Sequence, residues 1–357
     1  MEATIIVDIN PDAGSSFSEL SSLVETAGGR VSAELIQKGK PDSAFTLRKG
    51  KLAELKELVE RFKARLVVFN QGLSGTQTRN LEEELETKVL DRTGIILDIF
   101  AQRAKTSEAK LQVELAQAQY ILPKLVGSSF HLSRLGGGIG TRGPGETKLE
   151  CDRRRIRERI SVLKKAISRV KKERQEQRKK RKRSFLNAAI VGYTNAGKST
   201  LFSRLTKKEV YADNLLFATL DPTTSKIRVG GIDITLTDTV GFIQNLPTNL
   251  ISAFSATLQE VSEADIILHI VDLANPNFRE QIRSVEEILE GLGANSSERI
   301  TVFNKIDLVD KQISQQVRQG FSNSVAISSL SGEGIEELIA QFIVSRKKPY
   351  NFGEQKR

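Results

Sequence analysis

The segment Gly192-Tyr193-Thr194-Asn195-Ala196-Gly197-Lys198-Ser199 determines how the second half of the chain folds. An apolar run over residues 185–191 precedes it, and a helix-like segment beginning at Thr200 follows it. A strand, a Gly-x-x-x-x-Gly-Lys-Ser loop and a helix together form a P-loop, whose backbone N–H groups surround phosphate oxygens. We therefore expect Lys198 to contact the β- and γ-phosphates of a nucleotide and Ser199 to hold Mg²⁺. The alternative, a glycine-containing turn before an ordinary helix, does not explain the motifs downstream.

Two further motifs are expected to contact Mg²⁺ and the γ-phosphate of a bound nucleoside triphosphate. Residues 206–225 are polar and rich in turn formers, which predicts a mobile loop whose threonine joins Mg²⁺ and the γ-phosphate. Position alone leaves three candidates, Thr219, Thr223 and Thr224. Strand-like residues 234–237 then lead into Asp238-Thr239-Val240-Gly241. Asp238 is expected to hold Mg²⁺ through water, and the Gly241 N–H is expected to contact the γ-phosphate.

The motif Asn304-Lys305-Ile306-Asp307 selects the base. The Asp307 carboxylate can accept hydrogen bonds from N1–H and the exocyclic amine of guanine. Adenine would leave a buried carboxylate unpaired, at a cost of about 1–3 kcal/mol. Asn304 is expected to tie this loop to the P-loop, and the Ser328-Ser329-Leu330 segment is expected to add an N–H for the guanine carbonyl. The ligand is therefore predicted to be GTP or GDP.

Phe242 follows the Asp-x-x-Gly motif, where many regulatory GTPases have a glutamine that orients water. A phenylalanine side chain cannot orient water. We therefore expect hydrolysis to be slow in the isolated protein and to depend on a group supplied by a partner. His269 lies within an apolar strand and is expected to be a core residue rather than a base.

Composition limits the class of protein. The chain has 357 residues, 39% of them hydrophobic and 27% charged, which indicates a globular protein of two or three domains. Its one cysteine, Cys151, permits no internal disulfide and fits a reducing compartment. No basic-then-apolar signal opens the chain and no apolar run could span a bilayer. We expect a cytoplasmic monomer with no membrane partner.

Residues 1–96 alternate between strand-like and helix-like segments. Strands are predicted over 4–8, 31–36, 66–69 and 88–90, and helices over 16–27, 51–63 and 78–86. This alternation predicts a small parallel sheet with helices packed on it. Ser74 and Thr76 are expected to be helix caps, and no catalytic cluster is visible.

Residues 97–125 and 149–177 carry apolar and small side chains with 4-3-4-3 spacing. Such heptads predict two long helices packed as an antiparallel hairpin, the first of them roughly 43 Å long. Residues 149–183 hold 17 Lys and Arg against 5 Asp and Glu, a net charge of +12 in a chain of net charge +10. The positive charge is therefore local and indicates a polyanionic partner. A helical linker with a solvated charged face is the alternative, and the charged run over 171–183 could be such a connector.

The predicted hairpin is closed by residues 126–148, a long connection rich in glycine. Loops of this length are usually functional or disordered. Glycine permits close backbone approach to RNA, and His131, Arg134, Arg142 and Lys148 supply donors for phosphates or bases. A second phosphate-binding loop and simple flexibility are the alternatives, although no Gly-Lys-Ser or Gly-Lys-Thr follows.

The chain resembles the HflX family of translation-associated GTPases. The resemblance is carried by the P-loop, by Phe217-Ala218-Thr219-Leu220-Asp221, by Asp238-Thr239-Val240-Gly241-Phe242 and by Asn304-Lys305-Ile306-Asp307. Its most specific part is Gly140-Thr141-Arg142-Gly143-Pro144-Gly145-Glu146-Thr147-Lys148-Leu149-Glu150 with Asp152-Arg153-Arg154-Arg155-Ile156. It implies a Ras-like GTPase domain, an N-terminal domain with a helical hairpin, and binding to the large ribosomal subunit. It also implies that Thr219 is the switch threonine, and some members of the family separate ribosomal subunits.

These interpretations define an α/β protein: a Ras-like P-loop GTPase domain and an N-terminal α/β domain with a long antiparallel helical hairpin. The expected parts are an α/β subdomain over 1–96, an arm over 97–183, the GTPase domain over 184–346 and a tail over 347–357. The expected catalytic residues are Lys198, Thr219 and Gly241, and the expected Mg²⁺ ligands are Ser199, Thr219 and Asp238. The expected nucleotide contacts are Gly192, Tyr193, Thr194, Asn195, Ala196, Gly197, Lys198, Ser199, Thr200, Phe217, Ala218, Thr219, Leu220, Asp221, Asp238, Thr239, Val240, Gly241, Asn304, Lys305, Asp307, Ser328, Ser329 and Leu330.

The expected function is a GTP-hydrolysing switch that holds the RNA of the large ribosomal subunit through its basic arm and glycine-rich loop, with a role in ribosome splitting or recycling. One alternative is an RNA-binding scaffold that uses GTP as a structural ligand. Another is a GTPase acting on a non-ribosomal RNA such as tRNA.

Overall fold

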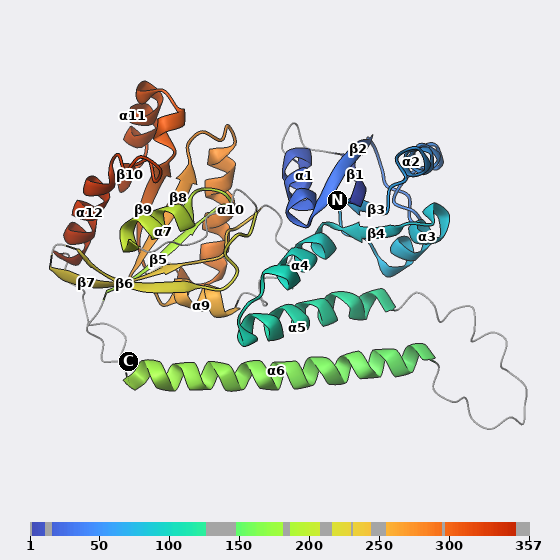
Figure 1. Ribbon diagram of the computed structural model, residues 1–357, viewed down its shortest axis with the longest axis horizontal. Helices are drawn as coiled ribbons and strands as arrows, with labels where there is room; N and C mark the ends of the chain where they lie inside the picture. The colour runs from blue at the N-terminus through green and yellow to red at the C-terminus, as the bar shows by residue number, and fades with distance from the viewer. Residues whose placement is uncertain are drawn as a thin grey trace, which may run out of the picture. The chain divides into compact units, whose positions relative to one another are not determined.

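The chain folds into two units, each built around its own β-sheet (Figure 1). The computed structural model describes residues 2–10, 16–125, 148–180, 186–207, 216–229, 231–243, 255–294 and 297–347. The first unit comprises Met1–Gln175 with Pro247–Ala253, and the second comprises Glu176–Leu246 with Phe254–Arg357. Within the described ranges, no helix is long and apolar enough to cross a membrane.

The sheet of the first unit is entirely parallel, with the strand order β2-β1-β3-β4. Its strands are β1 (Glu2–Ile9), β2 (Gly29–Gln37), β3 (Leu66–Phe69) and β4 (Lys88–Asp91). The helices between them are α1 (Ser16–Thr26), α2 (Lys49–Phe62) and α3 (Gly75–Leu85). The predicted alternation of strands and helices is therefore confirmed.

Helices cover both faces of this sheet. Leu55 of α2 and Leu81 of α3 pack in one core with Val7 and Val67 of the strands. α1 and α4 (Arg92–Arg103) pack against each other and against the strands as well. Five apolar residues of α4 are buried: Ile95, Ile96, Leu97, Ile99 and Phe100. α4 therefore belongs to the sheet, and the domain boundary expected after residue 96 falls inside it.

The single helix predicted over 97–125 is wrong, because the chain breaks between α4 and α5 (Ser107–Lys124). Ala104 is extended, with a ψ of 110°, and the Thr106 hydroxyl accepts a hydrogen bond from the Ala109 N–H at 3.1 Å. Thr106 is thus the N-cap of a new helix. The heptad pattern continues across the break because Leu97 and Ala104, which occupy heptad positions, are buried in the core of the first unit.

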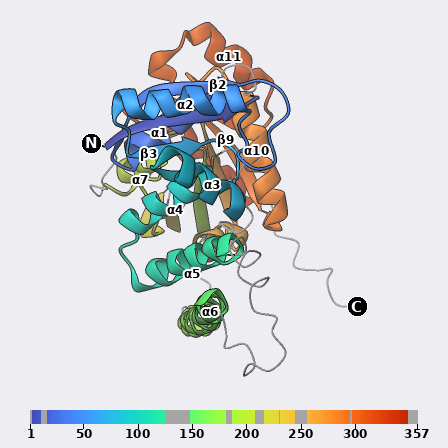
Figure 2. The same cartoon turned by 90° about the vertical axis from the view of Figure 1, so that its right-hand side faces the viewer.

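The antiparallel hairpin predicted from the two heptads is present, but its first helix is the shorter α5: α5 and α6 (Lys148–Lys180) lie side by side in both views (Figures 1 and 2). Arg159 of α6 donates to both carboxylate oxygens of Glu114 of α5, at 2.6 and 2.9 Å. Leu163, at a heptad position, is 1% exposed. The residues between heptad positions are largely exposed, so most of the surface of α6 faces solvent.

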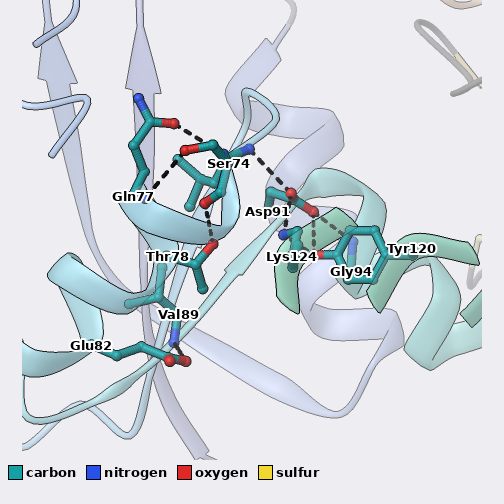
Figure 3. A network of polar contacts seen from close by, with 10 residues as sticks. Ser74, Gln77, Thr78, Glu82, Val89, Asp91, Gly94, Tyr120 and Lys124 are labelled. Carbon is teal, nitrogen blue, oxygen red and sulfur yellow. Dashed lines mark hydrogen bonds and ion pairs between the residues drawn. The ribbon is translucent and has the colours of Figure 1, made fainter. Parts of the chain in front are cut away.

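A buried carboxylate fixes the last turn of α5 to the sheet (Figure 3). Asp91, at the end of β4, accepts hydrogen bonds from the Gly94 N–H at 2.8 Å and the Leu73 N–H at 3.2 Å. It also accepts from the Tyr120 hydroxyl at 2.7 Å and from Lys124 Nζ at 2.8 Å. Burial and the Asp91 charge raise the pKa of Tyr120, which keeps the hydroxyl protonated as a donor. The end of α5 that leads into the glycine-rich segment is therefore held by charge-assisted hydrogen bonds.

Ser74 caps α3 as predicted, whereas Thr76 does not (Figure 3). The Ser74 hydroxyl accepts from the Gln77 N–H, and the Gln77 side chain accepts from the Ser74 N–H, which together form a capping box. Thr76 lies inside the first turn of the helix.

The sheet of the second unit has the order β10-β9-β8-β5-β7-β6, and all neighbours are parallel except β6 and β7. Its strands are β5 (Leu186–Gly192), β6 (Thr223–Val229), β7 (Ile232–Asp238), β8 (Ile266–Asp272), β9 (Glu298–Asn304) and β10 (Ser324–Ala326). The helices are α7 (Lys198–Thr206), α9 (Ser255–Ser262), α10 (Phe278–Gly291), α11 (Lys311–Gln319) and α12 (Ile335–Lys347), with a 3₁₀ turn η3 (Ile306–Leu308).

Opposite faces of this sheet carry different helices. Phe202 of α7 and Phe342 of α12 pack in one core with Ile190 and Leu268. Residues of α10 and α11 pack in another core with Phe303. Because β5, β7, β8 and β9 are parallel, their carboxyl ends meet at one edge, where open α/β sheets bind ligands.

Candidate active site

Close contacts with neighbouring strands fix two glycines of the P-loop. Gly192 has a φ of 151°, and a Cβ atom there would lie 2.2 Å from the Ile270 carbonyl oxygen. Gly197 has a φ of 92°, and a Cβ atom there would lie 2.2 Å from Asn304 Nδ2. Larger residues would displace the loop from β8 and β9, so its geometry requires glycine. The predicted strand–loop–helix unit is present, since β5 ends at Gly192 and α7 begins at Lys198.

The Lys198 side chain lies inside the P-loop and is 6% exposed. Its ammonium group donates a hydrogen bond to the Tyr193 carbonyl oxygen at 2.7 Å. A Cβ atom on Gly241 would lie 2.9 Å from Lys198 Nζ, so Gly241 is directly beside this cation. Burial lowers the pKa of Lys198 to about 8, and the charge of Asp238 opposes the shift. A cation with so little access to water favours the approach of an anion.

Ser199, Thr219 and Asp238 bring their side-chain oxygens together at the start of α7. Ser199 Oγ donates to Asp238 Oδ2 at 2.7 Å and lies 2.8 Å from Thr219 Oγ1. Thr219 Oγ1 lies 3.2 Å from the same carboxylate oxygen. Asp238 Oδ1 is buried without a hydrogen-bond partner, and burial raises the pKa of this carboxyl against the effects of its neighbours. An under-coordinated carboxylate beside two hydroxyls fits the oxygen-only ligand set of a hard cation such as Mg²⁺.

Of the three candidate threonines, Thr219 is the one that lies at this cluster. Thr223 and Thr224 belong to β6, where Thr224 Oγ1 lies 3.2 Å from Thr237 Oγ1 of β7. The loop predicted through residue 225 is therefore too long at its C-terminal end, since alternate residues of this segment are buried against β7.

The residues around Thr219 anchor it through apolar side chains. Phe217 and Leu220 are buried, and Ala218 and Asp221 are half-buried. Because the side chains of Phe217 and Leu220 are in the core, their backbone groups are the parts that could contact a nucleotide. The anchoring holds Thr219 within reach of Ser199.

The segment after Asp238 is paired with the P-loop. Thr239 Oγ1 donates to the Ile190 carbonyl oxygen at 2.7 Å, and Val240 is buried. The Phe242 N–H donates to the Gly192 carbonyl at 3.0 Å, and the Phe242 carbonyl accepts from the Thr194 N–H at 2.8 Å. The Phe242 ring is fully buried, so it offers no polar group to a water molecule.

In the motif expected to select the base, Asn304 makes the predicted connection to the P-loop. Its Nδ2 donates to the Ala196 carbonyl oxygen at 2.8 Å, and its Oδ1 accepts from the Ser329 N–H at 2.9 Å. Lys305 forms an ion pair with Asp272 at 2.7 Å. The Asp307 carboxylate is exposed, which corrects the expectation that it is buried. A bound base itself would have to desolvate it.

The Ser328–Leu330 segment is held by its own backbone and side chains. The Ser328 N–H donates to the Glu333 carbonyl at 3.0 Å, and Ser328 Oγ accepts from the Ser331 N–H at 3.1 Å. The Ser329 N–H donates to Asn304, so the Leu330 N–H is the backbone donor of this segment considered below for a guanine carbonyl. Leu330 is 75% exposed, as a residue at the rim of a binding site would be.

Sequence reasoning did not identify two residues of this edge. Asp272 is the last residue of β8, the apolar strand that holds His269, so its position was a usable signal for the partner of Lys305. Arg204 contacts the carbonyls of Ser329 and Leu330 from α7, and no local pattern marks it.

The remaining predicted contacts surround the P-loop. Thr194 is buried, with an Oγ1 that has no hydrogen-bond partner, and Asn195 is exposed with a φ of 61°. Thr200 is half-buried in the first turn of α7. The predicted RNA contacts His131, Arg134 and Arg142 lie outside the described residues, as does the tail after residue 347. Cys151 forms no disulfide within the part of the chain that the structure describes.

Three family comparisons cover most of the chain. Residues 14–101 match the family described as GTP-binding GTPase N-terminal, and residues 103–181 match the GTP-binding GTPase middle region. Residues 187–305 match the family described as 50S ribosome-binding GTPase. The GTPase HflX of Caldanaerobacter subterraneus is 49% identical over 343 residues, which are 95% of this chain and 79% of the relative. The chain belongs to the HflX family of GTPases.

The HflX family has other members of similar relatedness. The GTPase HflX of Escherichia coli is 45% identical over 325 residues, which are 90% of this chain and 76% of the relative. This chain, like those relatives, is a GTPase whose nucleotide is GTP or GDP.

Solved structures show the same fold. A GTP-binding protein of Sulfolobus solfataricus in complex with GDP has a TM-score of 0.51 at 24% identity, covering 97% of this chain and 98% of that chain. A complex of SsGBP with GDP has a TM-score of 0.55 at 24% identity, covering 96% of this chain and 98% of that chain. This chain thus shares an α/β fold with these GTP-binding proteins.

His269 is a core residue, as the sequence predicted. It lies in β8 and is 4% exposed. Burial, together with the positive charges of Arg299 and Lys198, lowers the pKa of His269 to about 4. The imidazole therefore stays neutral over the physiological range of pH.

Acidification should destabilise the protein through His269. In the unfolded chain this histidine binds a proton below its ordinary pKa of 6.5, whereas in the folded chain it stays neutral down to about 4. The unfolded state therefore binds more protons, and stability falls as the pH falls through this window. Between about pH 7 and about pH 5 the loss should be about 2 kcal/mol larger than in a His269→Gln variant. Urea unfolding at both pH values measures it, and equal losses in the two proteins would contradict it.

Proposed function

We propose that this chain is a GTP-hydrolysing switch that binds the large ribosomal subunit through the α5–α6 hairpin and the glycine-rich segment, with a role in ribosome splitting or recycling. The observation that carries the ribosomal part is the surface of α6. Among the side chains of α6 that the structure describes, the exposed basic residues are Arg154, Arg155, Arg157, Arg159, Lys164, Lys165, Arg169 and Lys172. Exposed arginines and lysines along one helix bind phosphates, which every ribosomal RNA surface presents.

The nucleotide part of the proposal follows from the edge of the second sheet. Lys198 would contact the β- and γ-phosphates, and Ser199, Thr219 and Asp238 would hold Mg²⁺, which neutralises phosphate charge when bound. Gly241, beside the Lys198 ammonium, would present its N–H to the γ-phosphate. Asp307 and the Leu330 N–H would recognise guanine.

The switch depends on Thr219. Its hydroxyl lies within hydrogen-bonding distance of both Ser199 and Asp238, so the loop that carries it is tied to the P-loop at the proposed cation site. Loss of the γ-phosphate would remove ligands from that site and release Thr219. The proposal predicts that GTP and GDP forms differ in affinity for the ribosomal subunit.

The isolated protein should hydrolyse GTP slowly, and large ribosomal subunits should accelerate it by at least about ten-fold. The buried Phe242 ring supplies no group to orient water, so we expect that group to come from a partner. Phosphate release under multiple turnover, with large subunits and with small subunits as the control, measures the effect. A purified protein that turned over near ~10 s⁻¹ without a partner would contradict it.

Binding to large ribosomal subunits also distinguishes this function from the other candidate functions. Pelleting with large subunits in GTP, GDP and a non-hydrolysable analogue should show the strongest association in the triphosphate states. An RNA scaffold with structural GTP would bind equally in all three. A GTPase acting on another RNA would fail to pellet with the subunits but would respond to that RNA.

A further inference from the structure

The guanidinium group of Arg204, in the last turn of α7, contacts the Ser328–Leu330 segment. Nε donates to the Ser329 carbonyl oxygen at 2.7 Å, and Nη2 donates to the Leu330 carbonyl oxygen. A Cβ atom on Gly332 would lie 2.6 Å from Nη1, so the third nitrogen is also against the loop. A planar guanidinium that reaches two successive carbonyls fixes their directions, which the single ammonium group of a lysine cannot do.

The geometry of the peptide bond extends this effect to the Leu330 N–H. The Ser329 carbonyl and the Leu330 N–H belong to the same planar trans peptide group and point in opposite directions. Holding the carbonyl toward Arg204 therefore points the N–H away from it. On the preceding peptide, the Ser329 N–H is held by Asn304 at 2.9 Å. The Leu330 N–H is thus oriented from both sides, by Asn304 and by Arg204.

We propose that Arg204 is a positioning residue for base selectivity: it orients the Leu330 N–H toward the carbonyl oxygen at position 6 of guanine. The inference rests on the proposed base contacts of the Ser328–Leu330 segment. α7 then acts on both ends of the nucleotide, because its N-terminus carries Lys198 and Ser199 and its last turn carries Arg204. Asp307 is proposed to accept from the N1–H and the exocyclic amine of guanine, and this contact does not depend on Arg204.

The test compares three diphosphates by calorimetry at slightly acidic pH. GDP carries both recognised groups, 6-thio-GDP replaces the carbonyl oxygen by a weaker acceptor, and IDP lacks the exocyclic amine. The proteins are wild type, Arg204→Met, Arg204→Lys and the matched control Lys207→Met, which removes an exposed charge next to the same helix end. Circular dichroism confirms that each variant is folded.

We expect the wild type to bind GDP about ten-fold more tightly than 6-thio-GDP, the value of one hydrogen bond. Arg204→Met should lose about ten-fold in GDP affinity and should bind GDP and 6-thio-GDP almost equally. Its preference for GDP over IDP should match that of the wild type, because Asp307 reads the amine. Arg204→Lys should be intermediate, and Lys207→Met should behave as wild type.

Two outcomes would overturn the inference, and only the second would also contradict the proposed base contact of the Leu330 N–H. If the wild type discriminates against 6-thio-GDP and Arg204→Met keeps the same ratio, Arg204 does not position the donor, even if all affinities fall together. If the wild type binds 6-thio-GDP as tightly as GDP, the proposed contact of the Leu330 N–H fails as well.

Discussion

Replacing Lys198 with methionine should lower the rate of GTP hydrolysis by about a thousand-fold. The Lys198 ammonium is buried beside Gly241, where the γ-phosphate is expected, so water has little access to take over its role. Methionine keeps the length and apolar stem of the side chain, which limits damage to the packing. Single-turnover hydrolysis with large ribosomal subunits present measures the effect on the chemical step.

The control for this variant is Lys207→Met, which removes a lysine from the other end of α7. It should hydrolyse GTP at the wild-type rate. Since the ammonium is proposed to contact the β- and γ-phosphates, Lys198→Met should lose more affinity for GTP than for GDP. Hydrolysis within about ten-fold of wild type would show that Lys198 does not stabilise the transition state.

Replacing Arg157, Lys164, Lys165 and Arg169 together by glutamine should weaken binding to the large subunit on the order of a hundred-fold at physiological salt. All four side chains are exposed on α6, so their removal leaves the seam with α5 intact. Each lost phosphate contact should also reduce the salt dependence of binding by about one unit of logarithmic slope. Pelleting at several salt concentrations measures both quantities.

A matched variant tests whether binding depends on the surface of α6 or only on the net charge of the protein. Replacing Arg30, Lys38, Lys40 and Lys63 by glutamine removes the same number of exposed charges from the first unit outside the hairpin. This variant should bind subunits nearly as wild type, and both variants should keep wild-type GDP affinity. Equal weakening by the two variants would mean that α6 is not the contact surface.

Local patterns predicted the α/β class of the second unit and the strand ends at which the candidate site lies, but not the helices α9, α10, α11 and α12. The P-loop, the Asp238 segment and the Asn304 segment each follow a strand, so their places in the chain also gave their places at the sheet edge. Thr219 could be separated from Thr223 and Thr224 by resemblance, and contacts with Ser199 in the folded chain agree.

Contacts between distant parts of the chain could not be predicted. Arg204 and Ser329 are 125 residues apart, and nothing beside either residue indicates that they meet. The heptad over 97–125 was misleading for a related reason. Helical spacing shows that one face is buried but not what covers it, and Leu97 packs in the first unit's core rather than against α6. The capping signal at Thr106 was the local clue to the break.

The Asp91 carboxylate determines how mechanical load would pass through the first unit. It joins β4, the start of α4 and the final turn of α5, so bending at that joint would strip a lysine and a tyrosine from a buried anion. The last turn of α5 and the sheet are therefore coupled at this joint, and a load on that turn would be transmitted to β4 through Asp91.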